Sequence, residues 1–488
     1  MKTTLTILPR IVLTLVLAAL VAASSIYSQQ PDRSKPPELG PPPALTLPPI
    51  QKSTLANGIQ VVVMEKHNVP LVQMNLLIRA GSAMESQDKI GLASLTAAML
   101  KEGAGGKSSL ELADAIDYLG ASINTMAGSH TSGVYLHTPL SKFDQAMTLF
   151  ADIVLRPAFM ATELERLRKE RLTSLVQMYD QPTAIASVAA ATLVFGEKHP
   201  YGRGTFGNEK SLRSFTIDEV KAFYSKFYNA SNATFIVVGD VKTADIVAKL
   251  EKAFGTWPKG EQAKVIVPVA DQVKGRTLYL IDKPDAPQSV IRISRVGADR
   301  MSPDYFPILV MNTILGGSFS SRLNMNLREK HGYTYGANSG FDFRPSPGPF
   351  TASSSVQTAV TDKAMTEFMN ELKGILEKVP DQELTRAKNY LALSYPGDFE
   401  TSSQIASQLG EMITYDLPAD YFNKYIGKIL AVTGEDVQRV AKKYINPNSL
   451  AIIVVGDQKK VEKGLSDLKL GALKTMKIED VLGKMPKL

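Results

Sequence analysis

The feature of this sequence that most constrains its fold is an internal repeat with a constant spacing. The stretch TIDEVKAFYSKFYNASNATFIVVGDV begins at Thr216 and matches TGEDVQRVAKKYINPNSLAIIVVGDQ, which begins at Thr433 (433 − 216 = 217). Each copy predicts an amphipathic helix, a turn and an apolar strand that ends in Gly-Asp. The same offset relates Lys66 to Lys283 in two upstream stretches that predict strand, turn, strand. Two regions with one spacing indicate a duplicated chain.

The repeat divides the chain into two homologous domains, residues 51–265 and 276–472. Residues 266–275 are expected to link them, and residues 473–488 to form a Lys-rich tail. Strands and long helices alternate in both halves, which predicts a sheet with helices packed on it in each. The expected fold is therefore α+β, with two homologous α/β sandwich domains that enclose a space between them.

The first 50 residues predict an exported protein. Lys2 and Arg10 precede the apolar run IVLTLVLAALVAASS, and this order is typical of a signal peptide, placed at residues 1–28. A retained signal anchor is the alternative. Residues 29–50 are so rich in proline that we expect an extended linker. The periplasm is the expected compartment, without membrane association after the signal is cleaved.

The composition excludes two classes of function. The chain contains no cysteine, so disulfide and thiolate chemistry are ruled out. Its net charge of +7 is spread along the chain without blocks of lysine and arginine. A nucleic-acid surface needs clustered positive charge, so no nucleic-acid partner is expected.

Three stretches resemble the insulinase (pitrilysin) family of zinc metallopeptidases, in its shorter bacterial and mitochondrial-processing-peptidase-like form. They are LANGIQVVVMEKHNVPLVQMNLLIRAGSAME, GEKHPYGRGTFGNEKSLRSFTIDEVKAFYSKFYNASNATFIVVGDV and ILGGSFSSRLNMNLREKHGYTYGANSGF. The resemblance extends over about residues 51–465 and implies the family's fold, with a peptide-binding chamber between the domains. It also implies that a peptide adds as a strand to an exposed sheet edge, for which residues 120–139 are the candidate.

Family members carry an inverted zinc motif, His-x-x-Glu-His, on a helix that matches GLASLTAAMLKEG. Two histidines four residues apart lie on one helix face and can bind one zinc ion, and the glutamate acts as general base. Ser94, Ala97 and Ala98 occupy these three positions here, and Leu175 matches the third ligand, a glutamate. We therefore predict that this chain binds no metal and has no catalytic residue of its own.

The second half keeps residues that the family uses on the substrate. The segment LREKHGYTY matches an arginine and a tyrosine that reach toward the zinc cleft, here Arg328 and Tyr335. A guanidinium offers rigid donors to a peptide carbonyl or carboxylate, and a phenol can donate to a developing oxyanion. Packing or a surface ion pair is the alternative role for both residues.

The sequence thus resembles the family subunit that lacks the zinc motif. The expected function is that of a non-catalytic, substrate-binding subunit of an exported heterodimeric peptidase, whose zinc is held by a homologous partner. A non-enzymatic scaffold or peptide-binding protein with the same fold is the alternative. A peptidase with an unrecognised site is a third hypothesis, which the absence of three zinc ligands disfavours.

Overall fold

The structure is a computed structural model that describes residue 40 and residues 45–264 and 266–487. The predicted signal peptide, residues 1–28, lies outside these described residues, as does most of the predicted linker. Within the described ranges, every helix is too short or too polar to span a lipid bilayer.

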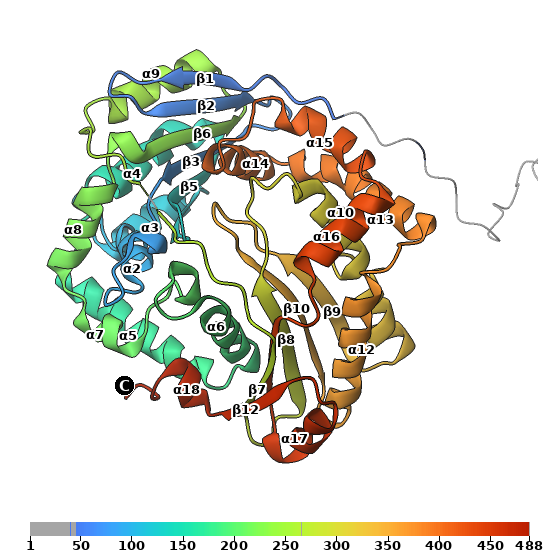
Figure 1. Ribbon diagram of the computed structural model, residues 1–488. Helices are drawn as coiled ribbons and strands as arrows, with labels where there is room; N and C mark the ends of the chain where they lie inside the picture. The colour runs from blue at the N-terminus through green and yellow to red at the C-terminus, as the bar shows by residue number, and fades with distance from the viewer. Residues whose placement is uncertain (1–39, 41–44, 265, 488) are drawn as a thin grey trace, which may run out of the picture. The chain divides into compact units, whose positions relative to one another are not determined.

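The first half forms a six-stranded sheet with the strand order β1-β2-β6-β3-β5-β4 (Figure 1). Its strands are β1 (Gln51–Thr54), β2 (Gln60–Glu65), β3 (Leu71–Ile78), β4 (Ser122–Ala127), β5 (Ser132–Pro139) and β6 (Ala233–Gly239). Strand β6 pairs in parallel with β2 and antiparallel with β3. All seven of its residues are buried, as its unbroken apolar sequence predicts for a central strand covered on both faces.

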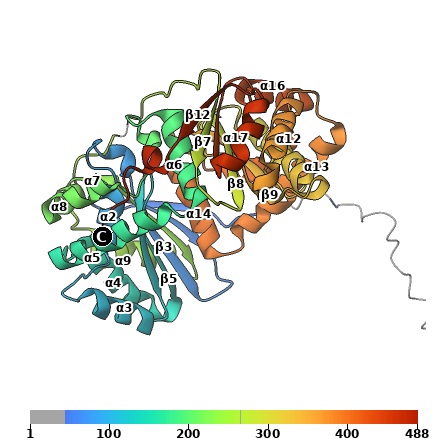
Figure 2. The ribbon, with the colours of Figure 1, turned by 90° about the horizontal axis from the view of Figure 1, so that it is seen from below.

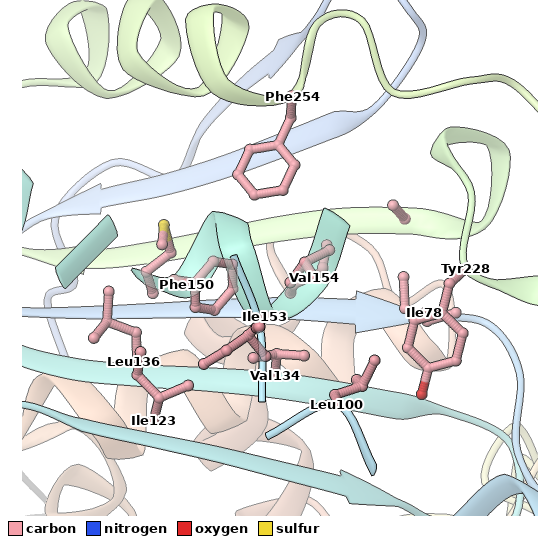
Figure 3. Close-up of a cluster of buried hydrophobic side chains, with 14 of the residues drawn as sticks. Ile78, Leu100, Ile123, Val134, Leu136, Phe150, Ile153, Val154, Tyr228 and Phe254 are labelled. Atoms are coloured by element: carbon pink, nitrogen blue, oxygen red, sulfur yellow. The ribbon is translucent and has the colours of Figure 1, made fainter. Parts of the chain in front are cut away.

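One face of this sheet is covered by helices of the first half. They are α2 (Leu92–Met99), α3 (Ser109–Tyr118), α4 (Phe143–Leu155), α5 (Ala161–Met178), α7 (Glu209–Ser214), α8 (Ile217–Phe227) and α9 (Thr243–Phe254). The core beneath them is built around Phe150, Phe235 and Phe254, whose ring centroids lie 4.8–6.4 Å apart. Figure 3 shows Phe150 close to Ile153, with Phe254 and Leu136 further away in the same core.

The second half repeats this plan with the strand order β12-β7-β11-β8-β10-β9. Its strands are β7 (Arg276–Asp282), β8 (Gln288–Val296), β9 (Thr334–Phe341), β10 (Pro349–Gln357), β11 (Leu450–Gly456) and β12 (Ala472–Met476). The buried strand β11 pairs in parallel with β7 and antiparallel with β8, as β6 does with β2 and β3. The duplication predicted from the sequence is therefore present in the strand order.

Helices of the second half cover one face of the second sheet, opposite the face that α6 contacts (Figure 2). They are α10 (Tyr305–Leu315), α11 (Arg322–Asn324), α12 (Thr361–Gly374), α13 (Asp381–Ser394), α15 (Tyr421–Leu430), α16 (Gly434–Tyr444) and α17 (Gln458–Asp467). The repeated helices α8 and α16 begin alike, because Thr216 and Thr433 both form capping boxes with the residue three positions on.

The two halves exchange one helix each. Helix α6 (Pro182–Phe195) belongs to the first half of the sequence but packs on strands β8 and β11 of the second sheet (Figure 1). Helix α14 (Ser402–Thr414) belongs to the second half but packs on β3 and β6 of the first sheet. Each sheet is thus covered on one face by its own helices and on the other by a helix from the opposite half.

The alternation of side chains along the central strands explains why each sheet needs both layers. In β6, Phe235 and Val237 face the core of the first half, whereas Ile236 and Val238 face α14. Strand β11 alternates in the same way between its own core and α6. The predicted fold class, two homologous α/β domains built of a sheet with packed helices, is confirmed.

The domain limits differ from the expected ones at both ends. Leu45, Leu47 and Ile50, which were assigned to the linker, pack beside α14 on the first sheet. Residues 473–488 were expected to be a tail, yet β12 adds to the edge of β7 and α18 (Ile478–Leu482) packs against α6. This segment is rich in lysine, so its sequence resembles a solvated tail. An edge strand tolerates such residues because much of its surface is exposed to solvent.

Candidate functional site

Helix α2 carries the segment that matches the family's zinc motif. It begins after Gly91, whose φ of 95° is readily adopted only by glycine. The buried carboxylate of Glu85 caps this end, accepting hydrogen bonds from the backbone N–H of Gly91 at 2.9 Å and of Ala93 at 2.7 Å. An anion at a helix N-terminus also interacts favourably with the helix dipole. The cap fixes where the helix starts and therefore which residues share a face.

The four positions that match zinc ligands and general base hold no metal-binding group. Ala97 is completely buried, and Ala98 and Leu175 pack against the core of the first half. The hydroxyl of Ser94 lies 2.7 Å from the carbonyl oxygen of Thr205, to which it donates. Helices α2 and α5 are in contact, so the arrangement of the two helices is kept although the ligands are absent.

Arg171 on α5 points at the first of these positions. Its Nη1 donates to the hydroxyl of Ser94 at 2.9 Å and to the carbonyl of Phe206 at 3.2 Å. The guanidinium carbon lies 5.1 Å from the centroid of the Phe206 ring. Only 9% of the residue is exposed. Burial lowers the pKa of Arg171 to about 10, so the side chain remains charged at neutral pH. A positive charge therefore lies where a zinc ion would require anionic or neutral donors.

The residues at this place do not fit a zinc site. A protein zinc site uses three or four ligands from histidine, cysteine, aspartate and glutamate. Within residues 45–264 and 266–487, no three such side chains are grouped so that they could hold a metal ion. The positive charge of the Arg171 guanidinium would also repel a zinc ion at this place. Arg171 links α2 to α5 through hydrogen bonds to Ser94, so it is a structural contact between the two helices.

Three of the histidines make contacts unrelated to a metal site in the described part of the chain. His199 in the KHPYG stretch accepts a hydrogen bond from the backbone N–H of Tyr201 at 3.0 Å, and its other ring nitrogen lies 2.9 Å from the carbonyl of Pro268. His130 lies 2.7 Å from the hydroxyl of Tyr201, and burial lowers its pKa to about 4. His67 pairs with Asp240 on the surface at 2.7 Å.

We expect Glu85 to make the stability of the protein depend on pH. Burial raises the pKa of this carboxyl from its ordinary 4.5 to about 7, although the N–H groups of Ala93 and Gly91 oppose this increase. The native state then keeps a proton that the unfolded state loses, so the free energy of unfolding falls as pH rises from about 4.5 to 7. The expected decrease is about 2–3 kcal/mol. Denaturant titrations of wild type and Glu85→Gln at pH 5 and pH 8 measure it.

The substitution Glu85→Gln removes the ionisable group, so the variant gains stability relative to wild type as the pH is raised. Glu170→Gln, an exposed carboxylate on α5, serves as the control and should leave the pH dependence unchanged. A constant difference between Glu85→Gln and wild type across this range would contradict the assignment.

Arg328 and Tyr335 lie on adjacent elements of the second half. Arg328 belongs to the π-helix Met325–Lys330, which packs against β9, and Tyr335 is the second residue of that strand. The guanidinium carbon lies 4.4 Å from the centroid of the Phe319 ring, and its single ion pair in the described residues is with the neighbouring Glu329. Tyr335 is 92% exposed. No described hydrogen bond joins Arg328 to Tyr335, and the Arg328 side chain is 34% exposed.

The two sheets differ at the edge strands to which a peptide could add. In the second sheet, the backbone N–H of Ala337 donates to Asn324 and that of Ser339 to the carbonyl of Gly316, which closes part of the β9 edge. In the first sheet, β4 forms the edge within residues 120–139, as predicted. The backbone of β4 makes no hydrogen bond with a described residue outside the sheet. Its edge is therefore open to strand addition.

The sequence reasoning missed Arg171 and Glu85. Arg171 precedes Leu175 by four residues on α5, a spacing that places both side chains on one helix face. That spacing was a usable signal. Glu85 had none, because it acts from a loop on residues six and eight positions later.

Comparisons with known proteins agree with this geometry. The family described as Insulinase (Peptidase family M16) matches residues 60–198, and the one described as Peptidase M16 inactive domain matches residues 214–391. A Rickettsia bellii protein named as an uncharacterized zinc protease is 26% identical over 405 residues, covering 83% of this chain and 90% of that protein. A Helicobacter pylori protein named non-peptidase homolog YmxG is 23% identical over 410 residues, covering 82% of this chain and 93% of that protein.

A solved structure supports the same assignment. The crystal structure described as peptidase M16 inactive domain from Pseudomonas fluorescens is 29% identical to this chain and has a TM-score of 0.78. The match covers 84% of this chain and 98% of that one.

Proposed function

Because the chain belongs to the insulinase family (peptidase family M16) yet has no zinc ligand at the matching positions, we propose that it is the substrate-binding subunit of a heterodimeric peptidase. The family match and the inactive-domain relatives support a non-catalytic protein with the insulinase fold. The proposal adds a homologous zinc-bearing partner, export from the cytoplasm, and a role for Arg328 and Tyr335.

The observation that carries the proposal is the contrast between the two halves. In the first half, Ser94, two alanines and Leu175 occupy the matching zinc-site positions, and Arg171 donates to Ser94. In the second half, Tyr335 is exposed, and the partly exposed Arg328 contacts only the Phe319 ring and the neighbouring Glu329 through its side chain in the described residues. A chain without any function would not be expected to lack the zinc ligands in its first half and yet carry the arginine and tyrosine in its second.

Each part of the proposed assembly has a chemical role. Zinc in the partner would supply an activated water molecule for peptide hydrolysis. In this chain, the guanidinium of Arg328 would hold a carbonyl or carboxylate of the peptide, and the Tyr335 hydroxyl would donate to the oxyanion that develops. The open edge of β4 would align the peptide as an added strand. The chain itself would bind no cofactor, and the complex would act after export, in the periplasm.

We expect the purified chain to cleave no peptide and to bind no stoichiometric zinc. Mixing it with a homologous chain that carries an intact His-x-x-Glu-His motif should produce cleavage of a fluorogenic peptide. Arg328→Ala should then lower kcat/KM of the mixture at least tenfold, about 1.4 kcal/mol of transition-state stabilisation. Tyr335→Phe should lower kcat more than it changes KM, because a phenol that serves an oxyanion acts in the transition state.

Two matched controls separate these effects from general damage. Arg386→Ala removes an exposed guanidinium from α13, and Tyr390→Phe removes the hydroxyl of a half-exposed tyrosine on the same helix. Neither should alter activity. Turnover and stoichiometric zinc in the lone chain would disprove the proposal.

A second function is favoured by one comparison. The Helicobacter pylori relative is named a non-peptidase homolog and matches over most of its length, so a scaffold or peptide-binding protein without any enzymatic partner is the alternative. Copurification with a protein that has no zinc motif, together with an Arg328→Ala, Tyr335→Phe double variant that behaves as wild type, would favour this alternative.

A further inference from the structure

The face of the second sheet that α6 covers is partly polar. Along β8, Ile291 and Ile293 face the apolar core of the second half, whereas Arg292 and Ser294 lie on the opposite face, with α6. The strand pairing places Arg292 beside Ser353 of β10, and Ser353 beside Asn338 of β9. Arg292, Ser353 and Asn338 thus form a row of cross-strand neighbours that leads from the centre of the sheet to its edge.

Arg292 is a charged side chain without a partner. It makes no hydrogen bond and no ion pair with any residue in the described parts of the chain, and its Nε is buried. Burial lowers the pKa of the guanidinium, and no neighbouring carboxylate counteracts this change. A guanidinium nevertheless keeps its proton in proteins. An unpaired charge that has lost part of its hydration destabilises the native state. A bound anion would compensate this charge.

The space around Arg292 is a groove made of two pockets. The larger has a volume of about 580 Å³ and lies between α6 and strands β8, β9 and β10. The smaller, about 310 Å³, contains Tyr335 at the sheet edge. Arg292, Asn338 and Ser353 line both pockets, so the two are continuous. We name this feature the Arg292 groove.

The groove has an excess of one positive charge. Its remaining charged side chains, Asp342 and Arg344, are paired with each other. The other lining groups are mainly hydroxyls, amides and glycines, which can donate to or accept from a peptide backbone. A single guanidinium suits the single charge and planar shape of a carboxylate. A phosphate group would call for further cations or a ring of backbone N–H groups, which the groove lacks among its described residues.

We propose that the Arg292 groove binds an extended peptide through one carboxylate, which forms a bidentate ion pair with Arg292. The peptide backbone runs along Ser353 and Asn338 toward Tyr335. This site is separate from the open edge of β4 and does not depend on a zinc-bearing partner. Its test is direct binding to the purified chain, so its failure can be distinguished from failure of the proposed heterodimer, which is tested by turnover.

The test uses fluorescence polarisation with three labelled ten-residue peptides of alanine, serine and glycine. One has a free C-terminal carboxylate, one a C-terminal amide, and one a C-terminal amide with a single internal aspartate. We expect the free acid or the aspartate peptide to bind wild type at least tenfold more tightly than the uncharged amide. Whichever of the two binds identifies the source of the carboxylate. Equal binding of all three would overturn the proposal.

Variants on β8 provide the second arm of the test. Arg292→Gln should abolish the preference for a carboxylate, and Arg292→Lys should restore part of it. Arg295→Gln removes the same charge from the same strand on the opposite face, where Arg295 contacts the carbonyl of Asn446, and should leave the preference intact. Arg292→Gln should melt at the same or a higher temperature than wild type, because it removes an unpaired charge. If Arg292→Gln kept the preference for a carboxylate, or lost that preference because it no longer folded, the assignment would be contradicted.

Discussion

Cut between its two domains, this chain is expected to give two halves that do not fold alone. A fragment of residues 45–264 retains the first sheet but lacks α14, so the face formed by Val62, Met64, Leu77, Ile236 and Val238 becomes exposed. Leaving these five side chains uncovered loses on the order of 10 kcal/mol, at roughly 1.5–3 kcal/mol each. This is comparable with the whole stability of an ordinary domain, about 5–15 kcal/mol.

The measurement is thermal unfolding followed by circular dichroism, with binding of a hydrophobic dye as the second signal. Residues 45–264 and 266–487, each alone, should show no cooperative transition and should bind the dye. Combined during refolding, the two fragments should associate and regain one transition, because each supplies the helix that the other lacks. A sharp, independent transition for either fragment would contradict the exchange as a source of stability.

A single substitution tests the same contact in the intact chain. Leu409 on α14 is fully buried against the first sheet, so Leu409→Ala should lower the free energy of unfolding by about 2–5 kcal/mol. Ser407→Ala, on the exposed side of the same helix, should change it by less than about 0.5 kcal/mol.

Restoring the zinc ligands is expected to fail unless Arg171 is also removed. The fourfold variant Ser94→His, Ala97→Glu, Ala98→His, Leu175→Glu provides the family's ligand types at the matching positions. It leaves the guanidinium of Arg171, which in the wild-type protein donates to the Ser94 hydroxyl at 2.9 Å. At about 5 Å and an effective dielectric constant of about 20, repulsion between this charge and a divalent ion amounts to several kcal/mol. Adding Arg171→Leu should therefore tighten zinc binding at least about 100-fold.

Competition with a chromogenic zinc chelator measures this difference. Lys169→Leu, which removes an exposed positive charge from the same helix, is the matched control and should tighten binding by far less than Arg171→Leu. Both fivefold variants are compared with the fourfold variant at the same ionic strength, because screening weakens such effects. Equal zinc affinity of the fourfold variant with and without Arg171 would show that the guanidinium is not what excludes the metal.

The sequence was sufficient to predict the duplication and the two sheets. The matching runs at Thr216 and Thr433 both contain a helix start and an apolar strand, and these local signals do not depend on the rest of the fold. The segment expected to carry an exposed edge does contain β4. Local pattern is reliable here because capping residues and apolar runs act over a few positions.

The helix exchange was not predictable from the same patterns. Helix α6, PTAIASVAAATLVF, consists almost entirely of small and apolar residues, so its sequence predicts burial without indicating which sheet it packs on. That choice depends on contacts of α6 with β8, about 100 positions later in the chain, and with β11, about 260 positions later. Arg171 and Arg292 pose a similar difficulty, because their partners or lack of partners become visible only in three dimensions.

The exchanged helices also occupy corresponding places in the two repeats. Helix α14 stands in the second repeat where α6 stands in the first, following a long helix and preceding the conserved helix and strand of the repeat. Equivalent helices that trade places across a two-fold relation are typical of a domain-swapped symmetric dimer. Joining the two protomers of such a dimer into one polypeptide gives this arrangement without rearranging any contact. The exchange therefore resembles domain swapping between two copies of one unit that are joined in a single chain, so neither half is complete without the other.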